Sequence, residues 1–198
     1  MKNFNYYTPT EIVFGNDSES KIGYLVRRYE GTKVLIHYGG KSAERSGLLN
    51  DICRQLDAEG ILYVKLGGVV PNPRLSKVYE GIELCRKEGV NHILAIGGGS
   101  VIDSAKAIAY GLAYDGDVWD LFDGKAEAKA CYPIGVVLTI PAAGSEMSNG
   151  CVITNEVGSR KRAYNNDLAR PKFAIMNPER TFSLSTYQTA CGIVDIMM

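Results

Sequence analysis

The stretch from residue 92 to residue 106 constrains the fold most, because a strand pattern, a glycine turn and a helix pattern follow one another without a gap. Residues 93–96 are continuously apolar, which is typical of a short strand buried on both faces. Three glycines come next, at positions 97–99. Apolar residues then recur at helical spacing at Val101, Ile102, Ala105, Ile108, Ala109 and Leu112. The stretch predicts a strand, a tight turn and a helix that packs on a sheet.

The glycine turn is a candidate phosphate site. Gly97, Gly98 and Gly99 remove every Cβ from the approach to a helix N-terminus, where free N–H groups and the helix dipole attract an anion. Ser100 is expected to be the N-cap. Asp103, three residues later, is expected to cap in return, to oppose the positive helix end and to order the turn. A tight strand-to-helix turn without any ligand has the same local pattern, so this alternative stays open.

Strand and helix patterns alternate along the chain. Short apolar runs predict strands at residues 11–15, 33–38, 61–66, 93–96, 134–140 and 173–176, and helical periodicity separates the first four. Residues 151–154 and 160–164 predict a hairpin, and residues 115–129 a polar loop whose aromatic cluster packs over the sheet. The sequence therefore predicts the α/β class, a Rossmann-like parallel sheet with helices on both faces.

Glycine stands at the carboxyl ends of three expected strands, where ligands of parallel sheets bind. These ends are Gly39-Gly40, Gly67-Gly68 and the turn at 97–99. A dinucleotide-binding unit usually carries an acidic residue for the adenine ribose, whereas Gly39 and Gly40 stand here, followed by Lys41 and Ser42. Glycine leaves room for a 2′-phosphate that Lys41 and Ser42 are suited to bind, so we expect NADP(H) rather than NAD(H). The alternative for Lys41 is a solvated loop charge.

Charge and cysteine content limit the class of protein. Lys plus Arg and Asp plus Glu both number 22, so we expect neither nucleic acid nor a membrane as partner. The five cysteines form no C-x-x-C pair, which favours reduced core thiols in a cytoplasmic protein. Cys191 lies four residues before Asp195, on the same face of an expected helix. Core packing is the preferred interpretation of Cys191, and a soft metal ligand is the alternative.

Four stretches share their pattern with a known family. They are Gly97-Gly98-Gly99-Ser100-x-x-Asp103-x-Ala105-Lys106, Pro71-Asn72-Pro73, residues 138–146, and Gly192-Ile193-Val194-Asp195. In this order they resemble the iron-containing (group III) alcohol dehydrogenases, and most closely the branch of butanol dehydrogenases and NADPH-dependent aldehyde reductases. The similarity runs from about residue 5 to the last residue and corresponds to the N-terminal part of such an enzyme.

The resemblance implies an oxidoreductase that transfers hydride between a nicotinamide and a small alcohol or aldehyde. It implies a dinucleotide-binding domain over residues 1–184, similar to the N-terminal domain of dehydroquinate synthase. It also implies that Asn72 lies beside the adenosine and that Thr139, Ser145 and Lys161 position the nicotinamide. Relatives usually carry threonine where Ala143 stands, so one hydroxyl contact is missing. From sequence alone, Lys161 belongs to a solvated basic turn at residues 160–162.

The resemblance further implies that residues 185–198 begin a truncated all-helical metal-binding domain. Ser185 and Gln188 form a capping box, which predicts a helix from Thr186. Asp195 matches the family's first ligand for iron or zinc, although a solvated residue or an interdomain hydrogen bond would also suit it. The chain's only histidines, His37 and His92, lie in expected strands and match no family ligand. One carboxylate is too few for a catalytic metal.

The expected helical second domain is therefore absent from this chain. We assign no catalytic residue among the 198 residues of the chain. We expect a piece of a larger enzyme that is a homo-oligomer at full length, with activity of the 198-residue chain alone in doubt. Two alternatives remain open. One is a nucleotide-binding module without catalysis, and the other is a lyase similar to dehydroquinate synthase.

Overall fold

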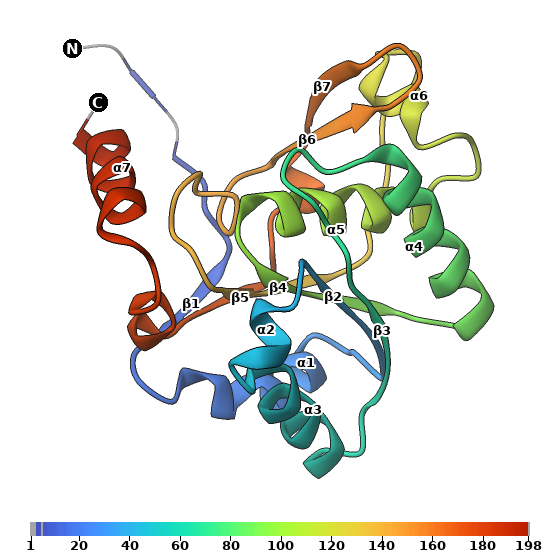
Figure 1. Cartoon of the computed structure of the whole chain (residues 1–198). Coiled ribbons are helices and arrows are strands. Elements are labelled where there is room, and N and C mark those ends of the chain that lie inside the picture. The colour runs from blue at the N-terminus through green and yellow to red at the C-terminus, as the bar shows by residue number, and fades with distance from the viewer. Residues whose placement is uncertain (1–2, 5, 198) are drawn as a thin grey trace.

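Six parallel strands form the central sheet of the computed structural model, which describes residues 3–4 and 6–197 (Figure 1). Their order is β1-β8-β5-β4-β2-β3, with β1 Glu11–Phe14, β2 Lys33–Tyr38, β3 Leu62–Leu66, β4 His92–Gly97, β5 Ile134–Leu138 and β8 Phe173–Met176. Every neighbouring pair runs parallel. All residues of β4 are buried, as the apolar run predicts. The predicted α/β fold is confirmed.

Helices cover both faces of the sheet and form two apolar layers (Figure 1). The main ones are α1 Ile22–Arg28, α3 Leu48–Ala58, α4 Leu75–Glu88 and α5 Gly99–Ala113. α4 and α5 share one layer, where Val78 and Ile108 are fully buried. α1 and α3 share the other, with Leu25 and Ile52. In α5 the periodic positions Val101, Ile102, Ala105, Ile108 and Ala109 are buried, and Lys106, Ala107 and Tyr110 are buried as well.

The chain leaves the neighbouring strands β2 and β4 toward opposite faces of the sheet. After β2 it enters the short helix α2 (Ser42–Arg45) and then α3, whereas after β4 it enters α5. α3 and α5 lie in different layers. This divergence makes the pair a topological switch point, and the crevice at such a point, beyond the carboxyl ends of the two strands, is the usual ligand position in open α/β sheets.

A two-stranded antiparallel hairpin, β6 (Gly150–Asn155) and β7 (Arg160–Asn165), stands beside the sheet as predicted. The loop at 115–129 contains α6 (Trp119–Phe122), which contacts β7 (Figure 1). Trp119 is buried, and the Arg160 guanidinium lies 5.4 Å from the centre of its ring. The aromatic cluster thus packs on the hairpin and in the layer of α4 and α5.

The last helix, α7 (Thr186–Met197), begins where the capping box predicts. The Gln188 N–H donates to Ser185 Oγ at 3.3 Å, and the Thr189 N–H to the Ser185 carbonyl at 3.0 Å. α7 stands at one side of the sheet (Figure 1), with Tyr187 79% exposed. Met198, part of the expected 185–198 segment, lies outside the described residues.

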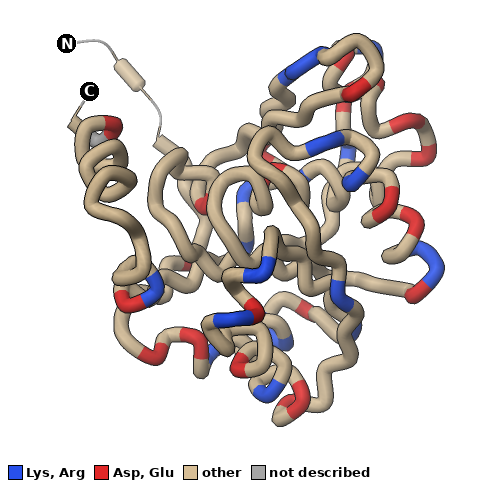
Figure 2. The backbone as a smooth tube through the Cα atoms, in the orientation of Figure 1, with Lys and Arg blue, Asp and Glu red and all other residues tan. Residues whose placement is uncertain are grey.

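Figure 2 shows basic and acidic residues interspersed along the described backbone, in keeping with their equal numbers. Among the described residues, no helix has the length and apolar character needed to cross a membrane. All five cysteines are free thiols. Cys53, Cys85 and Cys151 are buried as predicted, and Cys131 is half-buried. The preferred interpretation of Cys191 is wrong, because its side chain is exposed on α7 and borders a cavity.

Candidate functional site

The N-terminus of α5 meets the end of β4 at the crevice. The helix begins at Gly99 with Gly98 as N-cap, so the prediction that Ser100 is the N-cap is wrong. The Gly98 carbonyl accepts from the N–H groups of Val101 and Ile102, at 3.0 and 3.2 Å. Among the described residues, the N–H groups of Gly99 and Ser100 have no backbone acceptor. A 15-residue helix thus presents two free donors at its positive end.

Close packing is a second reason for the three glycines. A Cβ on Gly97 would lie 2.6 Å from Val101 Cγ2, and one on Gly98 would collide with Ile140 Cγ2. A Cβ on Gly99 would lie 3.4 Å from the Ala143 Cβ. The loop after β5 therefore rests directly on the glycine turn. The sequence predicted that the turn is open to a ligand, but it did not predict that the loop after β5 packs against the turn.

Asp103 does not cap the helix. Since α5 begins two residues earlier than predicted, Asp103 lies beyond its first turn. Its Oδ1 accepts from the Ser145 hydroxyl at 2.9 Å, and its Oδ2 accepts from the Val152 N–H at 3.0 Å. Burial raises the pKa of Asp103, and these two donors partly oppose the rise. The carboxylate ties the loop after β5 and the strand β6 to α5.

Lys106 is a functional candidate that sequence reasoning missed. Its side chain is fully buried, and its Nζ donates to the carbonyls of Ser145, Ser148 and Gly150 at 2.8, 2.8 and 2.9 Å. Burial lowers the pKa of Lys106, and the nearby Asp103 charge raises it. The available signal was a lysine on an otherwise apolar helix, one turn after an aspartate.

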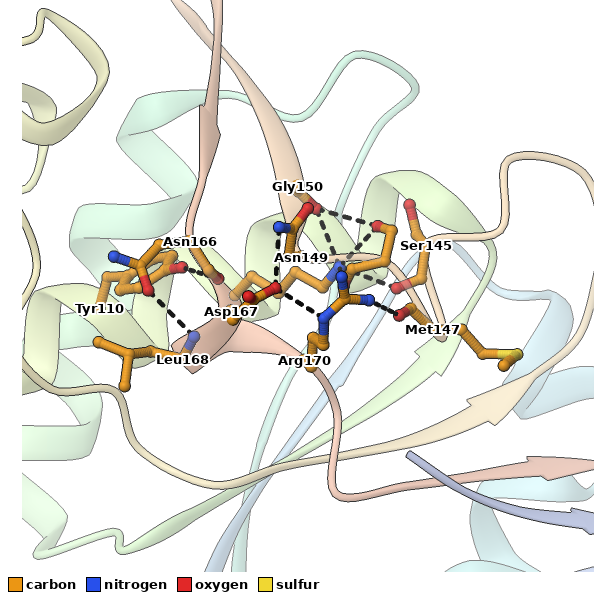
Figure 3. Close-up of polar contacts among 11 residues, drawn as sticks. Tyr110, Ser145, Met147, Asn149, Gly150, Asn166, Asp167, Leu168 and Arg170 are labelled. Atoms are coloured by element: carbon orange, nitrogen blue, oxygen red, sulfur yellow. Dashed lines mark hydrogen bonds and ion pairs between the residues drawn. The ribbon is translucent and has the colours of Figure 1, made fainter. Parts of the chain in front are cut away.

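A second cation, the Arg170 guanidinium, also holds this loop (Figure 3). Arg170 Nη1 donates to the Met147 carbonyl at 2.7 Å, and its Nε to Asp167 Oδ1 at 2.8 Å. The Asn149 side chain also donates to Asp167 Oδ1, at 3.0 Å. The segment from Ser145 to Gly150 is thus fixed by Lys106 and Arg170 together.

The ends of β2 and β3 lie side by side. The Gly68 N–H donates to the Gly39 carbonyl at 2.8 Å, and a Cβ on Gly40 would meet open space. Lys41 and Ser42 are exposed at the start of α2. Ser42 lines a cavity of about 410 Å³ together with Thr139, Ile140, Arg180 and residues before α7.

One nicotinamide candidate, Lys161, contacts the adenosine candidate, Asn72. Lys161 Nζ donates to Asn72 Oδ1 at 2.7 Å. The Thr154 N–H donates to the Pro73 carbonyl at 2.8 Å, which anchors the hairpin on the loop around Asn72. The Thr139 N–H donates to the Gly97 carbonyl at 3.1 Å, so Thr139 adjoins the turn. Ser145 is buried with its hydroxyl committed to Asp103.

Asp195 lies apart from these residues. It borders a cavity of about 550 Å³ between α7 and the loop at Ile140, Pro141 and Ala142, and Cys191 borders it one turn earlier. Within the described part of the chain, no three His, Cys, Asp or Glu side chains gather closely enough to hold a metal. His37 is fully buried in the sheet, where Nδ1 lies 3.0 Å from the Leu66 carbonyl. The described residues therefore do not fit a complete iron or zinc site.

A parallel sheet with a glycine turn at its crossover point and a helical cover on each face defines a doubly wound α/β domain. The family model for iron-containing alcohol dehydrogenases matches residues 9–178. The chain belongs to this family of oxidoreductases, and the resemblance found in the sequence is confirmed.

Relatives match along the whole chain. A probable NADH-dependent butanol dehydrogenase 2 of Bacillus subtilis is 45% identical over all of this chain and 50% of its own length. The NADPH-dependent aldehyde reductase YqhD of Escherichia coli is 37% identical over 98% of this chain and 50% of its own. The crystal structure of NADH-dependent butanol dehydrogenase A from Thermotoga maritima has a TM-score of 0.95 at 44% identity and covers 98% of this chain and 49% of its own. The chain therefore spans about half the length of these relatives.

Proposed function

We propose that this chain binds a nicotinamide dinucleotide across the carboxyl ends of β2, β4 and β5. Gly97, Gly98, Gly99 and Ser100 would hold the pyrophosphate. The observation that carries this proposal is the pair of free N–H groups on Gly99 and Ser100 at the positive end of α5. The crevice between β2 and β4 supports it, because ligands of such sheets bind there.

The remaining candidates follow from their place around the turn. Asn72 is proposed beside the adenosine, and Thr139 and Lys161 near the nicotinamide and its ribose. The Lys161–Asn72 hydrogen bond supports a single continuous binding surface between loop and hairpin. Ser145 and Asp103 are proposed to shape this surface, since their side chains bind each other.

We propose NADP(H) as the preferred form of the cofactor. Gly39 and Gly40 carry no carboxylate that would repel a 2′-phosphate, and Lys41 and Ser42 are exposed beside them. The named relatives include both NADH-dependent and NADPH-dependent enzymes, so the preference is a property of this chain's own residues. The end of β2 is therefore the place to test it.

In the whole enzyme, we propose hydride transfer between the nicotinamide and an alcohol or aldehyde. Asp195 is proposed as one ligand of a divalent metal, iron or zinc. The described residues do not complete that site, so the reaction itself is not assigned to side chains of this chain. The exposed face of α7 supports the division into a nucleotide-binding domain at 1–184 and the start of a metal-binding domain at 185–198.

Partners and location are proposed on the same basis. The proposed substrate is a small alcohol or aldehyde, as the names of the relatives suggest, and the whole enzyme is proposed to be a homo-oligomer. The balanced charge supports the view that nucleic acid and membranes are not partners. Five free thiols support a cytoplasmic location.

Titration of the chain with NADPH and NADH, followed by nucleotide fluorescence, tests the proposal. Gly99→Asp places a carboxylate at the two free amides, and we expect affinity to fall about tenfold or more because like charges repel. Gly99→Ala is the matched control, since its Cβ would lie at an ordinary 3.4 Å from the Ala143 Cβ. A wild-type chain that binds neither nucleotide, or a Gly99→Asp chain that binds as tightly as wild type, would contradict the site.

A further inference from the structure

The ammonium group of Lys106 is surrounded by oxygen atoms of the protein, as a bound metal or ammonium ion would be. Three main-chain carbonyls lie within 2.9 Å of its Nζ, and Ser148 Oγ lies at 3.2 Å. These acceptors come from a six-residue stretch, Ser145 to Gly150, that begins 39 positions after the lysine. No residue of this stretch carries a carboxylate toward Nζ except Glu146, whose charge acts at longer range. The lysine therefore binds the backbone itself.

The shape of the stretch places three carbonyl oxygens around a single cation. Its carbonyls at Ser145, Ser148 and Gly150 point to one place, and the carbonyl of Met147 turns to Arg170 (Figure 3). Oxygen dipoles directed at a common point repel one another, and buried carbonyls without donors are costly. If the ammonium were removed, the stretch would rearrange until its carbonyls found water or other donors.

Such a rearrangement would reach the glycine turn. Ser145 is the residue whose Oγ lies 3.5 Å from a Cβ position on Gly99 and whose hydroxyl donates to Asp103. The Met147 and Ser148 N–H groups both donate to the Gly144 carbonyl, at 3.1 and 3.0 Å. The tight turn at Gly144 transmits the position of the anchored stretch to Ala143, which also lies over Gly99.

We propose that Lys106 is a positioning residue for nucleotide binding. It holds the stretch from Ser145 to Gly150 on α5, so that the loop after β5 rests beside the turn and leaves the Gly99 and Ser100 amides open. This inference rests on the proposed nucleotide site, although the anchoring of the loop can be measured without any nucleotide.

Lys106→Ala combined with chemical rescue tests the inference. The substitution leaves a space that n-propylammonium matches in length and charge, whereas tetramethylammonium has the charge without N–H donors. We expect NADPH affinity to fall about tenfold in Lys106→Ala, and n-propylammonium chloride to restore most of it, because the buried carbonyls regain their donors. Tetramethylammonium chloride at equal ionic strength should restore none. Lys125→Ala, a change of an exposed lysine paired with Asp120, is the matched control and should bind as wild type.

Deuterium uptake over residues 141–150 supplies the second readout. In the nucleotide-free state we expect faster uptake in Lys106→Ala and a return to the wild-type rate with n-propylammonium. Lys106→Met, neutral but of similar length, should resemble Lys106→Ala and should not respond to the amine. Wild-type uptake and affinity in a folded Lys106→Ala chain would overturn the inference. Failure of both variants to fold, with and without the amine, would also overturn it, since Lys106 would then hold the fold rather than the loop. Loss of nucleotide binding by the wild type would instead overturn the proposed function.

Discussion

Lys161 and Asn72 are 89 positions apart in the sequence, yet the lysine Nζ lies 2.7 Å from the asparagine Oδ1. The contact joins the hairpin to the loop before α4. Asn72 has a left-handed backbone conformation with φ of 57°, and from this position its side-chain oxygen reaches Lys161. The two residues close one side of the crevice, so the hairpin belongs to the proposed binding surface.

Lys161→Met should weaken nucleotide binding without unfolding the protein. Both side chains are exposed, so their hydrogen bond contributes at most about 1 kcal/mol to the free energy of unfolding. Nucleotide affinity should fall several-fold while the free energy of unfolding changes little, because the ammonium is proposed to contact the ribose. Urea unfolding and NADPH titration of the same samples separate the two effects. Equal binding by Lys161→Met and wild type would remove Lys161 from the site.

Lys41→Glu should change the choice between the two cofactors. A carboxylate beside the 2′-phosphate repels it, so we expect the Kd for NADPH to rise about tenfold while the Kd for NADH stays within about twofold. The wild-type preference for NADPH should also weaken as salt is raised, because the charges are exposed and screened. Paired titrations at low and high salt provide the measurement. If both dissociation constants rise together, Lys41 acts on something other than the 2′-phosphate.

The two histidines should make the fold sensitive to acid. Burial lowers the pKa of both His37 and His92 to about 4. Between the ordinary pKa of about 6.5 and pH 4, the unfolded chain binds more protons than the folded one, so the free energy of unfolding falls as pH falls through this window. The loss amounts to about 3 kcal/mol per histidine.

His92 allows a direct test of that pH dependence. Its ring stacks on Phe173 at 5.9 Å, and among the described residues its nitrogens have no hydrogen-bond partner. His92→Leu should fold and should lose about half of the histidine contribution to the stability change between pH 7 and pH 4.5, as measured by urea unfolding. His37 keeps its contacts with the Leu66 carbonyl and Ser104 and supplies the rest. An unchanged pH slope in His92→Leu would show that His92 does not titrate on unfolding.

Cys191 should be the fast-reacting thiol of the folded chain. It is exposed on α7, whereas burial raises the pKa of Cys85 and Cys131 to about 12 and raises that of Cys151 further. A thiolate is the reactive form, so these buried groups react slowly. Titration with an aromatic disulfide reagent should show one fast thiol at neutral pH, five in denaturant, and no fast thiol in Cys191→Ser. A second fast thiol in the folded chain would contradict the packing described for the core.

The strand before the glycine turn was predictable because a run of apolar residues without alternation suits only an element covered on both faces. The start of α5 was placed two residues late, because serine is a strong N-cap by local preference whereas the chain uses Gly98. This shift moved Asp103 from a cap to a tether. Lys106 escaped prediction for a different reason. Its acceptors are main-chain carbonyls at least 39 positions further along the chain. Every residue has such a carbonyl, so the residue types do not show which ones accept from the lysine.

The Ile140 side chain is shared by the two cavities described above. It lines the cavity bordered by Ser42 and Thr139 and also the cavity bordered by Asp195. Phe182 and Leu184 line both cavities as well. A displacement of these shared side chains would change the lining of both cavities. Any resulting coupling between ligands bound in the two cavities would be mutual, because linkage changes both affinities by the same factor.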